Sequence, residues 1–137
     1  MKEGAKDVGD IEAVARIAVD CGLQVHRELG PGLLENVYET LLAAKLEKHG
    51  LLVERQKVLP IDLPDLKLDA AYRVDLLVGG RLIIEIKALE RLASLHSAQL
   101  LTYLRLSKQP VGLLMNFGGE TFRQGLRRVV NGMAGTA

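Results

Sequence analysis

The sequence predicts one α/β domain, built as a mixed sheet of about four strands flanked by helices. Apolar residues recur at spacings of three and four in two stretches before residue 50, as in amphipathic helices. From Leu51 the period changes to two, which is typical of strands. A third helical stretch, 92–107, leads into the nearly all-apolar segment 111–117, as expected for a strand covered on both faces.

Two helices open the predicted fold. The first spans residues 10–29, and its apolar stripe includes the single cysteine, Cys21, which we assign to the core. Gly30-Pro31-Gly32 must bend or restart the chain, because proline lacks a backbone donor and biases the preceding residue away from helix. The second helix follows from Leu34, and Gly50 ends it.

The remaining elements follow the change of period. Strands are predicted over residues 51–62, 69–78 and 81–88, and residues 120–130 are predicted to form a short final helix. The chain of 137 residues is long enough for one core but hardly for two. We therefore expect a single domain over 1–137 with its core at about 10–130.

Composition narrows the class of protein. The net charge is +1, so no strong basic field indicates nucleic acid, although a local patch can still bind phosphates. A lone cysteine rules out an internal disulfide. The N-terminal segment has no apolar stretch typical of a signal peptide, and no run of about 18 apolar residues predicts a membrane span. We expect a cytoplasmic protein that does not enter a membrane.

Three charged residues interrupt strands that should be apolar: Asp75, Glu85 and Lys87. A carboxylate among Val, Leu and Ile costs several kcal/mol unless something pairs with it. If the two strands form a hairpin with a shared core face, its loop is Gly79-Gly80-Arg81, which needs the left-handed residue that glycine supplies. This register places Asp75 directly opposite Glu85. The predicted pairs are Val78 with Leu82, Leu76 with Ile84 and Val74 with Ile86.

Such a cluster is suited to a metal-dependent active site. Cross-strand carboxylates lie roughly 5 Å apart between Cβ atoms and can share one Mg²⁺ or Mn²⁺, with the Ile86 carbonyl as a third ligand. Lys87 would hold a phosphate oxygen or orient and deprotonate the attacking water. The alternative, a solvated Glu85–Lys87 ion pair on an exposed sheet face, stays open.

Two further polar residues fit the same site. Gln99 lies in the predicted packing stripe of the 92–107 helix, together with Leu92, Leu95, Tyr103 and Leu106, so we expect a buried amide that needs a partner. A bond from Gln99 to a backbone carbonyl would satisfy it equally. Glu35 shares a helix face with Tyr38 and is alternatively a first-turn carboxylate favoured by the helix dipole.

These residues together resemble a known family. Gly32-Leu-Leu-Glu35-Asn-Val-Tyr38 matches the signature of the GxxExxY proteins, which are assigned to the PD-(D/E)xK nuclease superfamily. The resemblance covers roughly 13–130 and includes Arg73-Val-Asp75, Ile84-Glu85-Ile-Lys87, His96-x-x-Gln99-x-x-x-Tyr103 and Leu114-Met-Asn-Phe117.

The resemblance implies a restriction-endonuclease-like fold. It implies Asp75 and Glu85 as metal ligands, Lys87 as the catalytic lysine and Glu35 as an accessory acid near the metal. Gln99 and Tyr103 would support the site and contact nucleic acid. The expected cofactor is Mg²⁺ or Mn²⁺.

We therefore expect a metal-dependent nuclease acting on nucleic acid, with DNA as the favoured substrate. Candidate phosphate contacts include Arg73, Arg123, Arg127 and Arg128, each of which is alternatively a solvated surface charge. The run Arg123 to Arg128 is the only local concentration worth testing. Few aromatic residues and no added DNA-binding domain suggest that a homodimer or a protein partner completes the grip. Two alternatives stay open: a non-catalytic nucleic-acid-binding or assembly module, and a hydrolase of small phosphorylated molecules.

Overall fold

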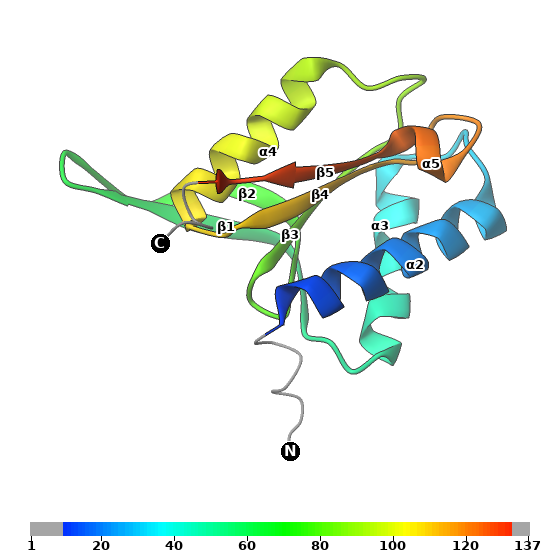
Figure 1. Cartoon of the computed structure of the whole chain (residues 1–137), viewed down its shortest axis with the longest axis horizontal. Helices are drawn as coiled ribbons and strands as arrows, with labels where there is room; N and C mark the ends of the chain where they lie inside the picture. Colours follow the sequence, from blue (N-terminus) through cyan, green and yellow to red (C-terminus); the bar gives the residue numbers. More distant parts are fainter. Residues whose placement is uncertain (1–9, 133–137) are drawn as a thin grey trace.

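The computed structural model describes residues 10–132 (Figure 1). The N-terminal segment, for which no signal peptide is expected, lies outside this range. The elements are α2 (Ile11–Leu29), α3 (Glu35–Lys48), β1 (Val53–Leu63), β2 (Leu66–Val78), β3 (Leu82–Lys87), α4 (Ser94–Ser107), β4 (Val111–Asn116), α5 (Phe122–Gly125) and β5 (Leu126–Val130). Within residues 10–132, no helix has the length and apolar character needed to span a membrane.

The strands form one five-stranded sheet in the order β1-β2-β3-β4-β5. Only β3 and β4 run parallel; the other three neighbouring pairs are antiparallel. The mixed sheet flanked by helices is therefore confirmed, with one strand more than expected. The parallel pair is joined by α4, the crossover helix that such a connection requires.

The predicted final helix over 120–130 is wrong for most of its length. Only Phe122–Gly125 is helical, and Leu126–Val130 forms β5, antiparallel to β4. Gly125 permits this turn, because a Cβ there would lie 2.2 Å from the Asn116 carbonyl oxygen. The extra strand pairs with an edge of β4 that would otherwise leave its backbone groups without partners.

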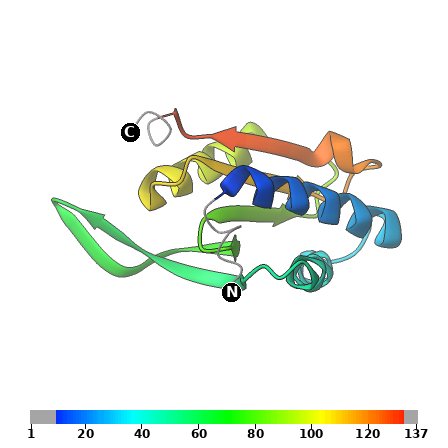
Figure 2. The same ribbon diagram turned by 60° about the horizontal axis from the view of Figure 1, so that its bottom comes forward.

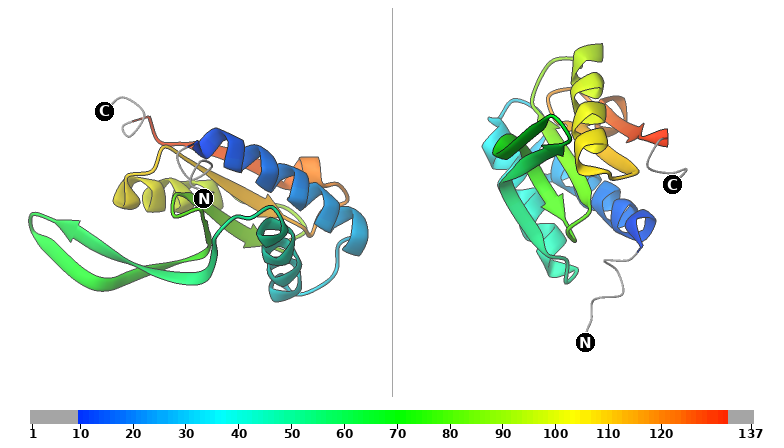
Figure 3. Two further views of the ribbon diagram at one scale, coloured as in Figure 1. Left: turned by 90° about the horizontal axis from the view of Figure 1, so that it is seen from below. Right: turned by 90° about the vertical axis from the view of Figure 1, so that its left-hand side faces the viewer.

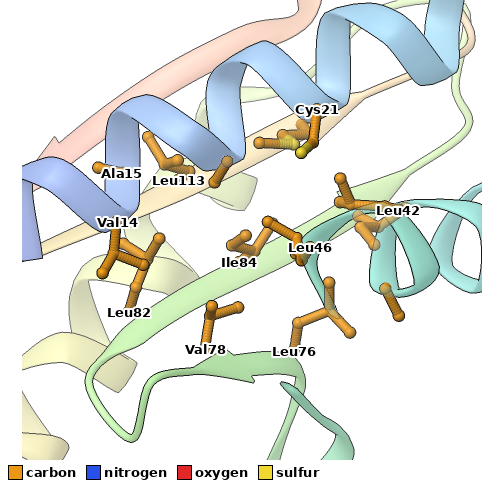
Figure 4. Packing of buried hydrophobic residues seen from close by; sticks show 14 of the residues in the cluster. Val14, Ala15, Cys21, Leu42, Leu46, Leu76, Val78, Leu82, Ile84 and Leu113 are labelled. Carbon is orange, nitrogen blue, oxygen red and sulfur yellow. The ribbon is translucent and has the colours of Figure 1, made fainter. Parts of the chain in front are cut away.

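Two helical layers cover the sheet. Helices α2 and α3 pack on one face, and α4 packs on the other (Figures 1 and 3). Figure 4 shows side chains of α2 and α3 meeting β2, β3 and β4, with Cys21 fully buried among them. The assignment of Cys21 to the core is thus confirmed. The burial of these apolar side chains, which contributes roughly 25 cal/mol per Å² of apolar surface, is the main source of stability.

The break between α2 and α3 occurs where the sequence places it. Gly30 and Gly32 have φ values of 69° and 107°, a region that glycine enters without steric cost. The Tyr38 hydroxyl donates to the Gly30 carbonyl at 2.7 Å and accepts from the Leu33 N–H at 3.0 Å. Tyr38 therefore fixes the turn that sets where α3 begins.

The hairpin of β1 and β2 extends beyond the helices as a two-stranded arm (Figures 2 and 3). At its tip, Ile61 pairs with Leu68 and Leu63 with Leu66, so these four apolar side chains share one face. The opposite face carries an ion pair between Asp62 and Lys67. The arm is thus an amphipathic ribbon.

Candidate active site

The hairpin of β2 and β3 has the predicted register over its first half. Val78 pairs with Leu82 and Leu76 with Ile84. Gly79 and Gly80 both have positive φ, 63° and 74°. The three-residue loop and its need for glycine are therefore confirmed.

Beyond Leu76 and Ile84 the ladder ends, and carboxylates take its place. The Ile86 N–H donates to Asp75 Oδ2 at 2.7 Å, and the Asp75 N–H donates to Glu85 Oε2 at 2.9 Å. The predicted pairing of Val74 with Ile86 is therefore wrong. Each strand instead offers a backbone N–H to a carboxylate of the other, so the structure brings Asp75 and Glu85 together.

The faces of β2 also change at this point. Leu76 and Val78 belong to the cluster beneath α2 and α3, as predicted, whereas Val74 packs in the cluster beneath α4. Strict alternation would place Val74 on the same side as Leu76. Alternation therefore breaks at Asp75, the residue whose side chain fills the gap between β2 and β3.

Glu85 is the most perturbed acid of the described residues. Glu85 is only 6% exposed. The pKa of Glu85 is raised to about 8, chiefly by burial and then by the neighbouring charge of Asp75, while the hydrogen bond from the Asp75 N–H and the charge of Lys87 act to lower it. The carboxylates are therefore short of positive charge.

Ile86 and Lys87 complete the strand end beside these acids. The N–H and C=O of one strand residue point to the same side, so the Ile86 carbonyl faces the gap that its N–H shares with Asp75. The backbone of Lys87 faces the other way, toward β4, where its carbonyl accepts from the Phe117 N–H at 2.8 Å. The Lys87 side chain is half-buried and acts electrostatically on Glu85.

Asn116 fixes the loop that follows Lys87. Its side-chain oxygen accepts from the Leu89 N–H at 2.8 Å, and its amide donates to the Leu89 carbonyl at 2.9 Å. Asn116 is 2% exposed and pairs with Lys87 in the register of β3 and β4. The buried amide thus holds the chain immediately after the lysine.

Glu35 lies at the first position of α3 and is exposed. Its charge contributes to the raised pKa of Glu85, which places it in the electrostatic environment of the gap. However, residues 10–132 contain no group of three or more His, Cys, Asp or Glu side chains arranged to hold a metal. The hydrogen bonds across the gap place oxygens of Asp75 and Glu85 there, beside the Ile86 carbonyl.

Helix α4 brings Tyr103 toward the acids but leaves Gln99 at the surface. Burial raises the pKa of Tyr103, with smaller contributions from the charges of Glu85 and Asp75. The Tyr103 ring stacks on Tyr72 with centroids 4.9 Å apart. The expected burial of Gln99 is wrong, because the face of α4 that packs on the sheet is formed by Leu100 and Leu104. Leu95, placed in the predicted packing stripe, is 72% exposed.

Two residues that the sequence did not indicate extend the site. Glu39 of α3 is 5% exposed, and its Oε1 accepts from Gln56 Nε2 at 2.7 Å. Gln56 Nε2 also lies 3.3 Å from Asp75 Oδ1. The one indication of Glu39 in the sequence was that this charged residue lies next to Tyr38 and close to Leu42. A left-handed glutamine within a strand leaves no sign in hydrophobic periodicity.

The four arginines considered as phosphate contacts differ in the partners that their side chains already have. Arg73 and Arg123 are exposed. Arg127 donates to the carbonyls of Gln124 and Leu126 and lines a polar cavity of about 600 Å³. Arg128 donates to both carboxylate oxygens of Glu12, at 3.0 and 2.6 Å, so its charge is already paired.

Comparison with known proteins gives one result. A family model described as the PD-(D/E)XK nuclease superfamily matches residues 12–129. That range contains all the strands and helices described above except the ends of α2 and β5. The chain matched none of the curated proteins and none of the solved structures.

Proposed function

Because the chain belongs to the PD-(D/E)XK nuclease superfamily, we propose that it is a metal-dependent nuclease that hydrolyses phosphodiester bonds of nucleic acid, with DNA as its substrate. We further propose the GxxExxY group within that superfamily, on Gly32, Glu35 and Tyr38. The observation that supports an active site most directly is the gap between β2 and β3. There, Asp75 and Glu85 replace the backbone ladder beside Lys87.

The donor set at the gap fits a hard divalent cation. Two carboxylates and one carbonyl supply only oxygen, which Mg²⁺ and Mn²⁺ prefer. The raised pKa of Glu85 reflects burial beside a like charge, a cost that a bound cation would offset. Asp75, Glu85 and the Ile86 carbonyl would hold the ion. When bound, it would polarise the phosphoryl group and acidify a water molecule.

The side chains around the gap would do the rest of the chemistry. The Lys87 ammonium would hold a phosphate oxygen, or Lys87 in its neutral amine form would orient the attacking water and accept its proton. Glu35, whose charge acts on Glu85, would assist as an accessory acid. Tyr103 would shape the pocket, and the exposed amide of Gln99, one turn earlier on α4, would contact the substrate.

Substrate contacts outside the gap would come from exposed arginines. Arg73 precedes Asp75 on β2, Arg123 lies on α5, and Arg127 lies on the edge strand β5. Arg128 would contribute only after leaving Glu12. A second copy of the chain or a protein partner would add surface for gripping a duplex.

The test is cleavage of labelled single-stranded, double-stranded and branched DNA, and of RNA, with Mg²⁺, Mn²⁺ or EDTA. Metal-dependent cleavage that Lys87→Ala abolishes would support the proposal, provided that circular dichroism shows the variant to be folded. No cleavage of any substrate, with calorimetry showing no cation binding, would contradict it.

A second candidate is a non-catalytic assembly module that keeps the nuclease fold. The amphipathic arm favours it, since Leu63, Leu66 and Leu68 are 43%, 43% and 46% exposed on a two-stranded ribbon. Tight nucleic-acid binding that is independent of metal and unaccompanied by cleavage would favour this function.

A further inference from the structure

Gln56 has an unusual backbone for its place in the fold. It lies inside β1 with φ 50°, a left-handed conformation that non-glycine residues rarely adopt. Among the described residues, the only other non-glycine residue with positive φ is Lys108. Lys108 is the C-cap of α4, where a left-handed residue is ordinary. Gln56 therefore needs a separate explanation, and strained residues concentrate at functional sites.

The position of Gln56 supplies one. The register pairs Arg55 with Leu76 and Lys57 with Val74, so Gln56 lies opposite Asp75 but outside the regular ladder. On the other side of β2, the pairing with β3 also ends at Asp75. The sheet is thus irregular on both sides of the same carboxylate.

The Gln56 side chain links that carboxylate to α3. Its Nε2 donates to Glu39 Oε1 at 2.7 Å and to Asp75 Oδ1 at 3.3 Å. Since Asp75 Oδ2 accepts from the Ile86 N–H at 2.7 Å, the two oxygens of Asp75 are each held by a different neighbouring strand. Free rotation of the carboxylate is thereby restricted.

Glu39 is itself held firmly. It is 5% exposed, and its Oε2 accepts from Arg55 Nε at 2.9 Å. Arg55 also donates to Asn36 Oδ1 at 3.2 Å and to Thr40 Oγ1 at 2.8 Å, both on α3. Arg55 balances the buried charge of Glu39, and Glu39 in turn fixes the Gln56 amide.

We infer that Gln56 is a positioning residue that orients Asp75 to receive the divalent cation. This rests on the proposed function, in which Asp75 is a metal ligand. A neutral amide suits the task, because it can donate to Asp75 without cancelling the negative charge that attracts the cation. A lysine or arginine in its place would compete with the ion. Partners that orient a metal ligand in this way commonly change metal affinity when they are removed.

Gln56→Gly separates this role from a purely structural one. Glycine accepts the left-handed backbone, so the variant should fold, but it lacks the amide that holds Asp75. We expect Mn²⁺ affinity, measured by calorimetry without nucleic acid, to fall by about tenfold or more. Gln56→Met, which keeps the length of the side chain without its donor, should show the same loss and provides the measurement if the glycine variant does not fold.

The matched control is Lys108→Gly, which makes the same change at the other left-handed residue, at the end of α4. Its Mn²⁺ affinity should equal that of the original chain. Where cleavage is measured, Gln56→Gly should raise the Mn²⁺ concentration needed for half-maximal rate more than it lowers the rate at saturating Mn²⁺.

The outcomes distinguish the two proposals. If the original chain binds Mn²⁺, Asp75→Asn abolishes binding and Gln56→Gly binds with unchanged affinity, the role of Gln56 is overturned while the metal site stands. If the original chain and Asp75→Asn both fail to bind Mn²⁺, the metal site and the role of Gln56 are overturned together.

Discussion

The hairpin of β2 and β3 has two halves that obey different rules. From Leu76 to Ile84, through the glycine loop, the strands pair and their apolar side chains pack against helices on both faces. At Asp75 and Glu85 the pairing stops, and carboxylates receive the backbone donors. The paired half is optimised for stability. The open half holds one buried acid, Glu85, whose charged form is disfavoured by burial and by the charge of Asp75, which is the trade-off expected of an active site.

The difference shows how a small domain can build a site without an added element. Ending one ladder early leaves the Ile86 N–H and carbonyl facing side chains rather than another strand. The adjoining paired half keeps these groups in place. The unpaired strand end therefore supplies oxygen ligands, and the rigid paired half beside it holds them in a defined geometry.

The largest expected effect is on catalysis at the open half. Lys87→Ala should lower the rate of metal-dependent cleavage by roughly 100-fold to 10,000-fold, the range for losing a proton-transfer residue. Lys48→Ala, an exposed lysine at the end of α3, is the matched control and should leave the rate unchanged. Equal rates in the Lys87 variant and the original chain would contradict a chemical role for the open half.

The paired half should respond in stability instead. Leu76 is fully buried, so Leu76→Ala should lower the free energy of unfolding by about 2–5 kcal/mol. Denaturation in urea with EDTA present would measure this. Asp75→Asn, one residue away, should cost much less, because the amide oxygen can still accept from the Ile86 N–H and only the longer bond from Gln56, at 3.3 Å, is lost. A comparable loss in both variants would show that the two halves do not differ in this way.

The pH dependence of stability should arise at Glu85. Its pKa in the folded chain, about 8, lies above the ordinary value of 4.5, so between these values the folded state holds a proton that the unfolded state has lost. The contribution of Glu85 to stability is therefore present below about pH 4.5 and is lost as pH rises toward 8.

Glu85→Gln should remove this dependence. In EDTA the melting temperature of the original chain should fall relative to that of the variant between pH 5 and pH 8.5. The shift should be several degrees, since roughly 4 °C corresponds to 1 kcal/mol in a domain of this size. Mn²⁺ at pH 8.5 should restore stability to the original chain but not to the variant. Parallel pH profiles in EDTA would contradict the assignment.

A smaller effect is expected at the loop. Gly79 has φ 63°, and a Cβ there would meet no heavy atom within 4 Å, so Gly79→Ala should cost only the backbone penalty, about 1–2 kcal/mol. Urea denaturation would measure it. Cation affinity should remain unchanged if the register of the paired half is set by side-chain burial as well as by the loop.

The same division explains what could be predicted from the sequence. Periodicity located α2, α3 and the paired half correctly, because burial selects the residues of these elements. It misassigned Val74, the face of α4 and residues 126–130. In each case, tertiary contacts decide: the gap at Asp75 turns Val74, and pairing with β4 makes residues 126–130 a strand.

The candidate site divides in the same manner. Asp75, Glu85 and Lys87 were predictable because charged residues stand out in apolar strands. Gln56 was not, since its role depends on a backbone angle and on a glutamate from another element. The exposure of Gln99 could not be predicted either, because it depends on how α4 is rotated about its axis. Similar residues lie on two adjoining faces of this helix, so the sequence does not fix that rotation.

The burial of Cys21 has a practical consequence for spectroscopy. The only thiol of the chain is fully buried, and burial raises its pKa, so maleimide reagents should scarcely reach it in the folded protein. A cysteine introduced at exposed Asp65, in the turn at the end of the arm, would then be the single reactive position. A fluorophore or spin label attached there would report on the arm without removing any native residue of the core.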